Sequence, residues 1–212
     1  MNRVVYLHGF ASSPKSKKAT AFRQRLEAIG FEVATPDLNG GSFRDLTISG
    51  MMKIVSEAVG DGPASLVGSS MGGYLAALYA ARHSEVERLV LLAPAFGFLR
   101  RWQRELGEEA VRRWRETGER MVMNYATGRE EPVGWRLMED AMNYEDEPAV
   151  LQPTLIFHGV KDDVVPVEVS RAYVRTRTSA ILCEVDSDHE LMSAFDEIWS
   201  GARDFLCGEE IC

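Results

Sequence analysis

Hydrophobic and polar positions follow two different periods along the chain. Short runs rich in Val, Ile and Leu are bounded by polar residues or glycine, which is typical of buried strands. Between these runs, apolar side chains recur every three or four residues, as on the buried face of a helix. The alternation predicts an α/β fold with a doubly wound, mostly parallel six-stranded sheet and helices on both faces. We expect the six strands at Val4–Leu7, Phe31–Thr35, Ser65–Val67, Leu89–Leu92, Thr154–Phe157 and Ile181–Val185.

The helices are predicted from their apolar stripes and from residues that end them. Phe22, Leu26 and Ile29 form the first stripe, and Gly30 follows it. A second stripe lies between residues 48 and 59 and ends at Gly60, a residue that commonly caps helices. Three more helices are expected at 74–82, 167–177 and about 191–205.

Residues from about 96 to 148 interrupt this alternation of strands and helices. They are rich in Arg and Glu, and they carry Trp102, Trp114 and Trp135. We interpret them as a helical cap or lid inserted into a single domain that spans residues 1–212. Trp102, Leu106 and Trp114 lie at helical spacing, which favours a face buried against the body of the domain. The alternative is that this face roofs an acyl pocket.

Composition and charge exclude several classes of protein. The 212 residues are 45% hydrophobic, enough for a large core, and carry a formal net charge of −8. Because phosphate binding requires a basic face, the acidic balance argues against a nucleic-acid partner. Cys183, Cys207 and Cys212 form no metal-binding or disulfide pattern, which favours a reducing cytoplasm. We expect no secretion signal and no membrane span. The oligomeric state stays open.

Residues 66–74, with the sequence LVGSSMGGY, contain the pattern G-x-S-x-G between a predicted strand and a predicted helix. In this pattern Ser70 lies at the tip of a sharp turn. Gly68 and Gly72, which have no side chains, leave the space that such a strained turn needs on either side of the serine. The motif predicts a nucleophilic serine, and an ordinary glycine-rich turn is the alternative.

Three further stretches extend the pattern around Ser70: LHGF after the first strand, HGVKDDVVP after the fifth, and an Asp-His pair after the last. Together with GSSMGG they resemble the α/β-hydrolase superfamily. The opening YLHGFASSPKSKKA is similar to that of small bacterial YqiA-type serine esterases. The resemblance implies an α/β-hydrolase fold that lacks the first two strands, and a catalytic triad in the order Ser, Asp, His.

His189 is the predicted base because it follows the last strand and lies in a polar loop. We expect His83 at the surface, and His8 and His158 to have structural roles in the loops after their strands. Asp162 aligns with the family's acid in G-x-x-D-x-x-V-P. Its neighbour Asp163 is the alternative acid.

The resemblance also implies a mechanism and a site. His189 would take the proton of Ser70 as the hydroxyl attacks an ester, and Asp162 would orient the imidazole. The backbone N–H groups of Met71 and, by resemblance, of Phe10 would hold the oxyanion. We expect Phe10, Met71, Phe96 and Trp102 to line the substrate site. No cofactor and no metal is implied.

The sequence therefore predicts a serine carboxylesterase that acts on small-molecule esters with short to medium acyl chains. A thioesterase, lactonase or peptidase with the same triad is one alternative. A binding protein of the same fold with an unused triad is another. Dehalogenase and epoxide hydrolase chemistry would place an aspartate where Ser70 stands.

Overall fold

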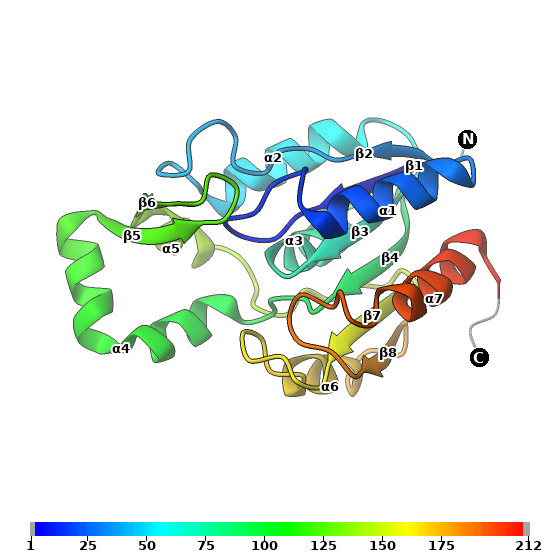
Figure 1. Ribbon diagram of the computed structural model, residues 1–212. Coiled ribbons are helices and arrows are strands. Elements are labelled where there is room, and N and C mark those ends of the chain that lie inside the picture. Colours follow the sequence, from blue (N-terminus) through cyan, green and yellow to red (C-terminus); the bar gives the residue numbers. More distant parts are fainter. Residues whose placement is uncertain (1–2, 210–212) are drawn as a thin grey trace.

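Six parallel strands form the central sheet of the computed structural model, which describes residues 3–209 (Figure 1). Their order across the sheet is β2-β1-β3-β4-β7-β8, and every pair of neighbours is parallel. The predicted fold class and all six predicted strands are thereby confirmed. The strands are β1 (Arg3–Leu7), β2 (Glu32–Ala34), β3 (Ala64–Ser69), β4 (Val86–Leu92), β7 (Thr154–Gly159) and β8 (Ala180–Val185).

Helices cover both faces of this sheet, as the alternation of strands and helices predicts. One face packs against α1 (Lys17–Ala28) and α7 (Phe195–Cys207), which lie side by side in Figure 1. The other face packs against α2 (Ile48–Val59), α3 (Met71–Ala80) and α6 (Glu168–Val174). Each face has its own cluster of buried side chains, so the sheet is the shared wall of two hydrophobic cores.

The insertion between β4 and β7 extends from the carboxyl edge of the sheet, on the left of Figure 1. It begins with α4 (Phe98–Thr117), continues as an antiparallel hairpin of β5 (Glu119–Asn124) and β6 (Arg129–Gly134), and ends with α5 (Arg136–Ala141). The hairpin is not among the elements expected from the sequence, which favours a wholly helical cap. In addition, Gly107 has non-helical backbone angles (φ 77°, ψ 160°) and kinks α4.

Buried tryptophan side chains hold α4 of the insertion against the β5–β6 hairpin. Trp114 is 2% exposed, and its indole N–H donates a hydrogen bond of 2.9 Å to the carbonyl of Val133 in β6. Its ring packs edge-on against Trp135, 5.6 Å away, and lies 6.4 Å from Trp102 on the other side of the kink. Within the predicted face, Trp114 is therefore buried against the hairpin, whereas Trp102 and Leu106 are half-buried.

Two expectations from the sequence concern disulfide bonds and membrane-spanning helices. Cys183 and Cys207 are free thiols, and Cys212 lies outside the described residues. None of the helices between residues 3 and 209 has the length and apolar character needed to cross a bilayer.

Candidate active site

The turn after β3 holds Ser70 in a backbone conformation that is rare for a residue with a side chain (φ 52°, ψ −116°). Neighbouring backbone stabilises this turn. The N–H of Ser70 donates to the carbonyl of Leu92 at 2.8 Å, and its carbonyl accepts from the N–H of Ala95 at 3.0 Å. Ser70 is half-buried and immediately precedes α3. The chain thus builds a nucleophile elbow at the carboxyl edge of the sheet.

The glycines of the motif are required by close backbone contacts. A Cβ on Gly68 would overlap the backbone of Gly72, and a Cβ on Gly72 would overlap the carbonyl of Leu7 at the end of β1. Larger residues would push α3 away from the sheet. The G-x-S-x-G spacing therefore reflects the need for residues without a Cβ at positions 68 and 72.

The loops after β7 and β8 bring an acid and a base together. His189 Nδ1 lies 2.7 Å from Asp162 Oδ2, and the Asp162 side chain is fully buried. The other carboxylate oxygen, Oδ1, accepts hydrogen bonds from the backbone N–H groups of Val164 and Val165. The carboxylate is therefore fixed on one side by its own loop and directs its second oxygen at the imidazole.

Burial alone would raise the pKa of Asp162, because a charged carboxylate loses its water. Hydrogen bonds from His158, His189 and the Val165 backbone outweigh this effect and lower the pKa well below its usual range. Asp162 is consequently a stable anion at neutral pH. Such an anion holds the proton of His189 on Nδ1 and leaves Nε2 free to act as a base.

Of the two adjacent aspartates in the sequence, only Asp162 contacts His189. Asp163 is exposed. The carboxylates nearer to His189 in sequence are engaged locally: Asp186 pairs with Lys161 at 2.5 Å, and Asp188 accepts from the N–H of Glu190.

Gly159 determines how closely the acid and base loops approach. A Cβ at this position would overlap the carbonyl of Ser187 and lie 2.6 Å from that of Asp188. The end of β7 can therefore pack directly against the loop that carries His189.

The remaining histidines take structural roles, in agreement with the sequence analysis. His8 Nε2 accepts a 3.0 Å hydrogen bond from the N–H of Leu38, and burial lowers the pKa of this imidazole. His158 donates from Nε2 to the carbonyl of Val165 and so closes the acid loop. His83 lies beyond the end of α3, is half-buried and stacks on Tyr79.

The loop after β1 packs against the elbow. A Cβ on Gly9 would lie 3.4 Å from Cβ of Ser70, so the backbone of residues 8–10 runs beside the serine. Met71 is the first residue of α3, where backbone N–H groups have no acceptor within the helix. Within residues 3–209, no backbone acceptor engages the N–H of Phe10 or of Met71. Both groups are available to a ligand at this edge.

No hydrogen bond joins the Ser70 hydroxyl to His189 among the described residues. Serine hydrolases without substrate often show this contact as long or poorly aligned, and it shortens when substrate binds. The Asp162 to His189 half of the arrangement is already formed.

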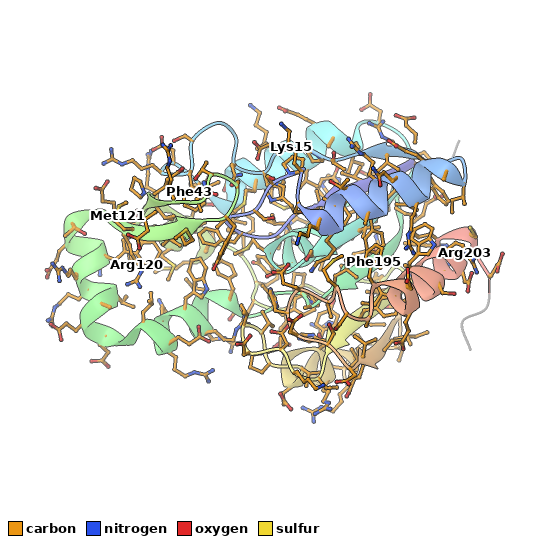
Figure 2. All side chains as sticks on the ribbon, viewed as in Figure 1. Lys15, Phe43, Arg120, Met121, Phe195 and Arg203 are labelled. Carbon is orange, nitrogen blue, oxygen red and sulfur yellow. The ribbon has the colours of Figure 1, made fainter. Side chains whose placement is uncertain are left out.

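A cavity of about 400 Å³ lies between the loop after β1 and the insertion. Phe10 and Trp102 line it, with their rings 4.9 Å apart and edge to face. Arg120 and Met121 of β5 also line it, and Figure 2 labels both on the hairpin. The other two residues expected in the substrate site are buried. Phe96 is 1% exposed and stacks on Tyr173, and Met71 is 2% exposed.

The sequence analysis missed two groups of residues in this region. The first is the β5–β6 hairpin, where the short apolar run of Met121, Val122 and Met123 was available as a strand signal. The second is Lys18, which is buried beside the elbow.

The sheet, the elbow and the paired acid and base define an α/β-hydrolase fold, and this class is confirmed by known structures. The chain belongs to the family described as an uncharacterised protein family, UPF0227, which it matches over residues 3–207. The structure of mouse alpha/beta hydrolase domain-containing protein 10 superimposes with a TM-score of 0.82 at 21% identity, over 97% of this chain and 90% of that one.

Two further relatives support the same class. A structure from Agrobacterium vitis S4 superimposes with a TM-score of 0.83 at 26% identity, over 97% of this chain and 88% of that one. In sequence, the chain is 27% identical to the mitochondrial palmitoyl-protein thioesterase ABHD10 of Bos taurus, over 91% of this chain and 68% of the relative. The comparisons thus support a hydrolase of the α/β class with esterase-like features.

Proposed function

We propose that this protein is a serine hydrolase that cleaves carboxylic esters of short to medium acyl chains through an acyl-enzyme on Ser70. The observation that carries the proposal is the 2.7 Å contact between Asp162 and His189, formed at the same sheet edge as a strained, half-buried serine. Beside a nucleophile, a buried carboxylate can orient the imidazole that acts as general base. As a purely structural pair the two groups would be costly to desolvate.

In the proposed mechanism, His189 Nε2 removes the proton of Ser70 while the hydroxyl oxygen attacks the ester carbonyl. The N–H groups of Phe10 and Met71 stabilise the oxyanion, and the positive end of the α3 dipole adds to this field. His189 then protonates the leaving alcohol, and water releases the acid in a second step. No cofactor enters these steps.

The cavity lined by Phe10 and Trp102 is the proposed acyl site. Its volume of about 400 Å³ lies within the range of small-molecule pockets. Most of its lining residues are aromatic or aliphatic, which suits an apolar acyl chain, and Glu105, Arg120 and Glu130 add charged groups to it.

A thioester is the second candidate substrate, because the Bos taurus relative is named a palmitoyl-protein thioesterase. The same triad and oxyanion donors serve esters and thioesters alike. The cytoplasmic location expected from the cysteine content stays a prediction. The bovine relative's name describes that protein as mitochondrial.

The test uses purified protein with p-nitrophenyl acetate, butyrate and octanoate, and with butyrylthiocholine as the thioester. We expect hydrolysis of the esters, loss of activity in Ser70→Ala, and labelling of Ser70 by a fluorophosphonate probe. A protein that hydrolyses neither ester nor thioester and leaves Ser70 unlabelled would be a non-catalytic member of the fold.

A further inference from the structure

Lys18 occupies an unusual position for a lysine. It lies in the first turn of α1 and is 8% exposed, whereas the other lysines of residues 3–209 are exposed. Burial of an ammonium group is costly, and a cation in the first turn of a helix is also opposed by the helix dipole. Because Lys18 is unfavourable both as a buried charge and as a cation in the first turn of a helix, we expect its side chain to have a role in the folded protein.

The contacts of Lys18 lie on both sides of the proposed site. Its Nζ donates to Ser69 Oγ at 3.1 Å and lies 3.5 Å from the carbonyl oxygen of His189. Ser69 is the last residue of β3 and directly precedes Ser70. One ammonium group therefore joins the strand that carries the nucleophile to the loop that carries the base.

The charged groups that face Lys18 come from the two loops around the site. Glu190 and Asp188 belong to the loop after β8, and Asp162 to the loop after β7. On the β1 side, Tyr6 lies beside Ser69, and burial raises the pKa of its hydroxyl, so it stays neutral. Burial lowers the pKa of Lys18 to about 8, against the opposing effect of these three carboxylates. Its charge is present below that pH and is lost above it.

We propose that Lys18 is a positioning residue of the active site, which holds the His189 loop against β3 so that the imidazole stays within reach of Ser70. The inference rests on the proposed function. Lys18 does not contact the reacting atoms. It acts through the His189 backbone and through Ser69, and it keeps a positive charge next to a loop that carries several carboxylates. Without it, that loop loses its link to the strand beneath Ser70.

Lys18→Met tests the inference, since methionine fills a similar volume without the charge. The matched control is Lys17→Met, on the exposed side of the same helix turn. We expect kcat for p-nitrophenyl butyrate to fall by about 10- to 100-fold in Lys18→Met, since misplacement of a catalytic group by about 1 Å costs on that order. KM should change by less than about twofold, because the acyl site is untouched. Lys17→Met should match the wild type.

The pH profile separates positioning from general stability. In the wild type, kcat should fall partially as pH rises through about 8, where Lys18 loses its charge. This alkaline limb should be absent from Lys18→Met and present in Lys17→Met. An alkaline limb that persists unchanged in Lys18→Met would overturn the assignment.

Ser69→Ala tests the same link from its other end, and it can be measured even if Lys18→Met does not fold. It removes the hydrogen-bond acceptor and retains the lysine, so kcat should fall while the melting temperature changes little. Where both variants fold, the double variant should be no slower than Lys18→Met alone, because both changes break one link.

The outcomes distinguish this inference from the function on which it rests. An inactive wild type whose Ser70 resists the fluorophosphonate would overturn both. An active wild type together with Lys18→Met and Ser69→Ala variants that retain full kcat would overturn the role of Lys18 alone.

Discussion

Replacing Asp162 with asparagine changes one atom of the proposed site and reverses the role of that atom. Oδ1 can keep its hydrogen bonds from Val164 and Val165, so the amide nitrogen takes the place of Oδ2. It then presents an N–H donor to His189 Nδ1 at 2.7 Å, and it faces His158 Nε2 at 3.3 Å, a nitrogen that already carries the hydrogen donated to the Val165 carbonyl. The His189 Nδ1 atom must then accept a hydrogen bond, so the imidazole proton moves to Nε2. In the proposed mechanism Nε2 is the atom that receives the proton of Ser70.

The size of the effect follows from this change of tautomer. In serine hydrolases the equivalent substitution lowers kcat by about 10⁴-fold, or roughly 5.5 kcal/mol of activation free energy. We expect a loss of that order in Asp162→Asn, with a smaller change in KM. Because Asp162 is fully buried, a stability cost of about 1–3 kcal/mol accompanies it.

The assay is steady-state hydrolysis of p-nitrophenyl butyrate at several pH values, with thermal melting to confirm that the variant is folded. Asp163→Asn is the control, since Asp163 is exposed and should keep kcat within about twofold. If Asp163→Asn loses activity and Asp162→Asn keeps it, the acid has been assigned to the wrong residue. If both keep it, the triad itself is refuted.

Further predictions concern the loops and the insertion. Gly159→Ala should lower both the melting temperature and kcat because its Cβ overlaps the base loop, whereas Gly62→Ala, with open space around it, should change neither. Trp114→Phe removes the indole hydrogen bond to β6 and should cost about 1 kcal/mol, measured by urea unfolding. Trp102→Ala should lower kcat/KM for octanoate more than for acetate; an equal loss on both would place the acyl chain elsewhere.

The central sheet could be predicted from the sequence because its signal is local. Each strand contains a short apolar run, and the four inner strands β1, β3, β4 and β7 are mostly buried, so for them the pattern of residues and the burial agree. The elbow is also local, since Gly68, Ser70 and Gly72 lie within five consecutive residues. Asp162 was predicted as the acid from a family pattern and His189 as the base from its place after the last strand, while their contact depends on loops that meet only in the folded protein.

The insertion was harder to predict, because its charged residues fit a helix as well as a hairpin. Glu116 and Arg120 are four residues apart, which suggests one helical face, yet α4 ends at Thr117 and Arg120 lies in β5. Gly118 ends the helix in a left-handed conformation (φ 78°). Glu116 pairs instead with Arg112, at 4.0 Å. The glycine at 118 was the local signal of this boundary.

Lys18 could not be assigned from the sequence at all. It stands next to an exposed lysine in a stretch that reads as an ordinary polar helix start. Its partners, Ser69 and the carbonyl of His189, lie 51 and 171 residues away along the chain. Only the packing of α1 against the sheet brings them within reach.

The order of the strands along the chain has a consequence for the newly made protein. A ribosome releases β1, β3 and the Ser70 turn well before it releases β8 and His189, which occupies a loop beyond the sheet's last strand. A nascent chain therefore carries the proposed nucleophile without its base. Until β8 pairs with β7 and α7 closes over the sheet, the serine has no partner to remove its proton. Reactivity toward esters would thus appear only as the final strand joins, late in synthesis.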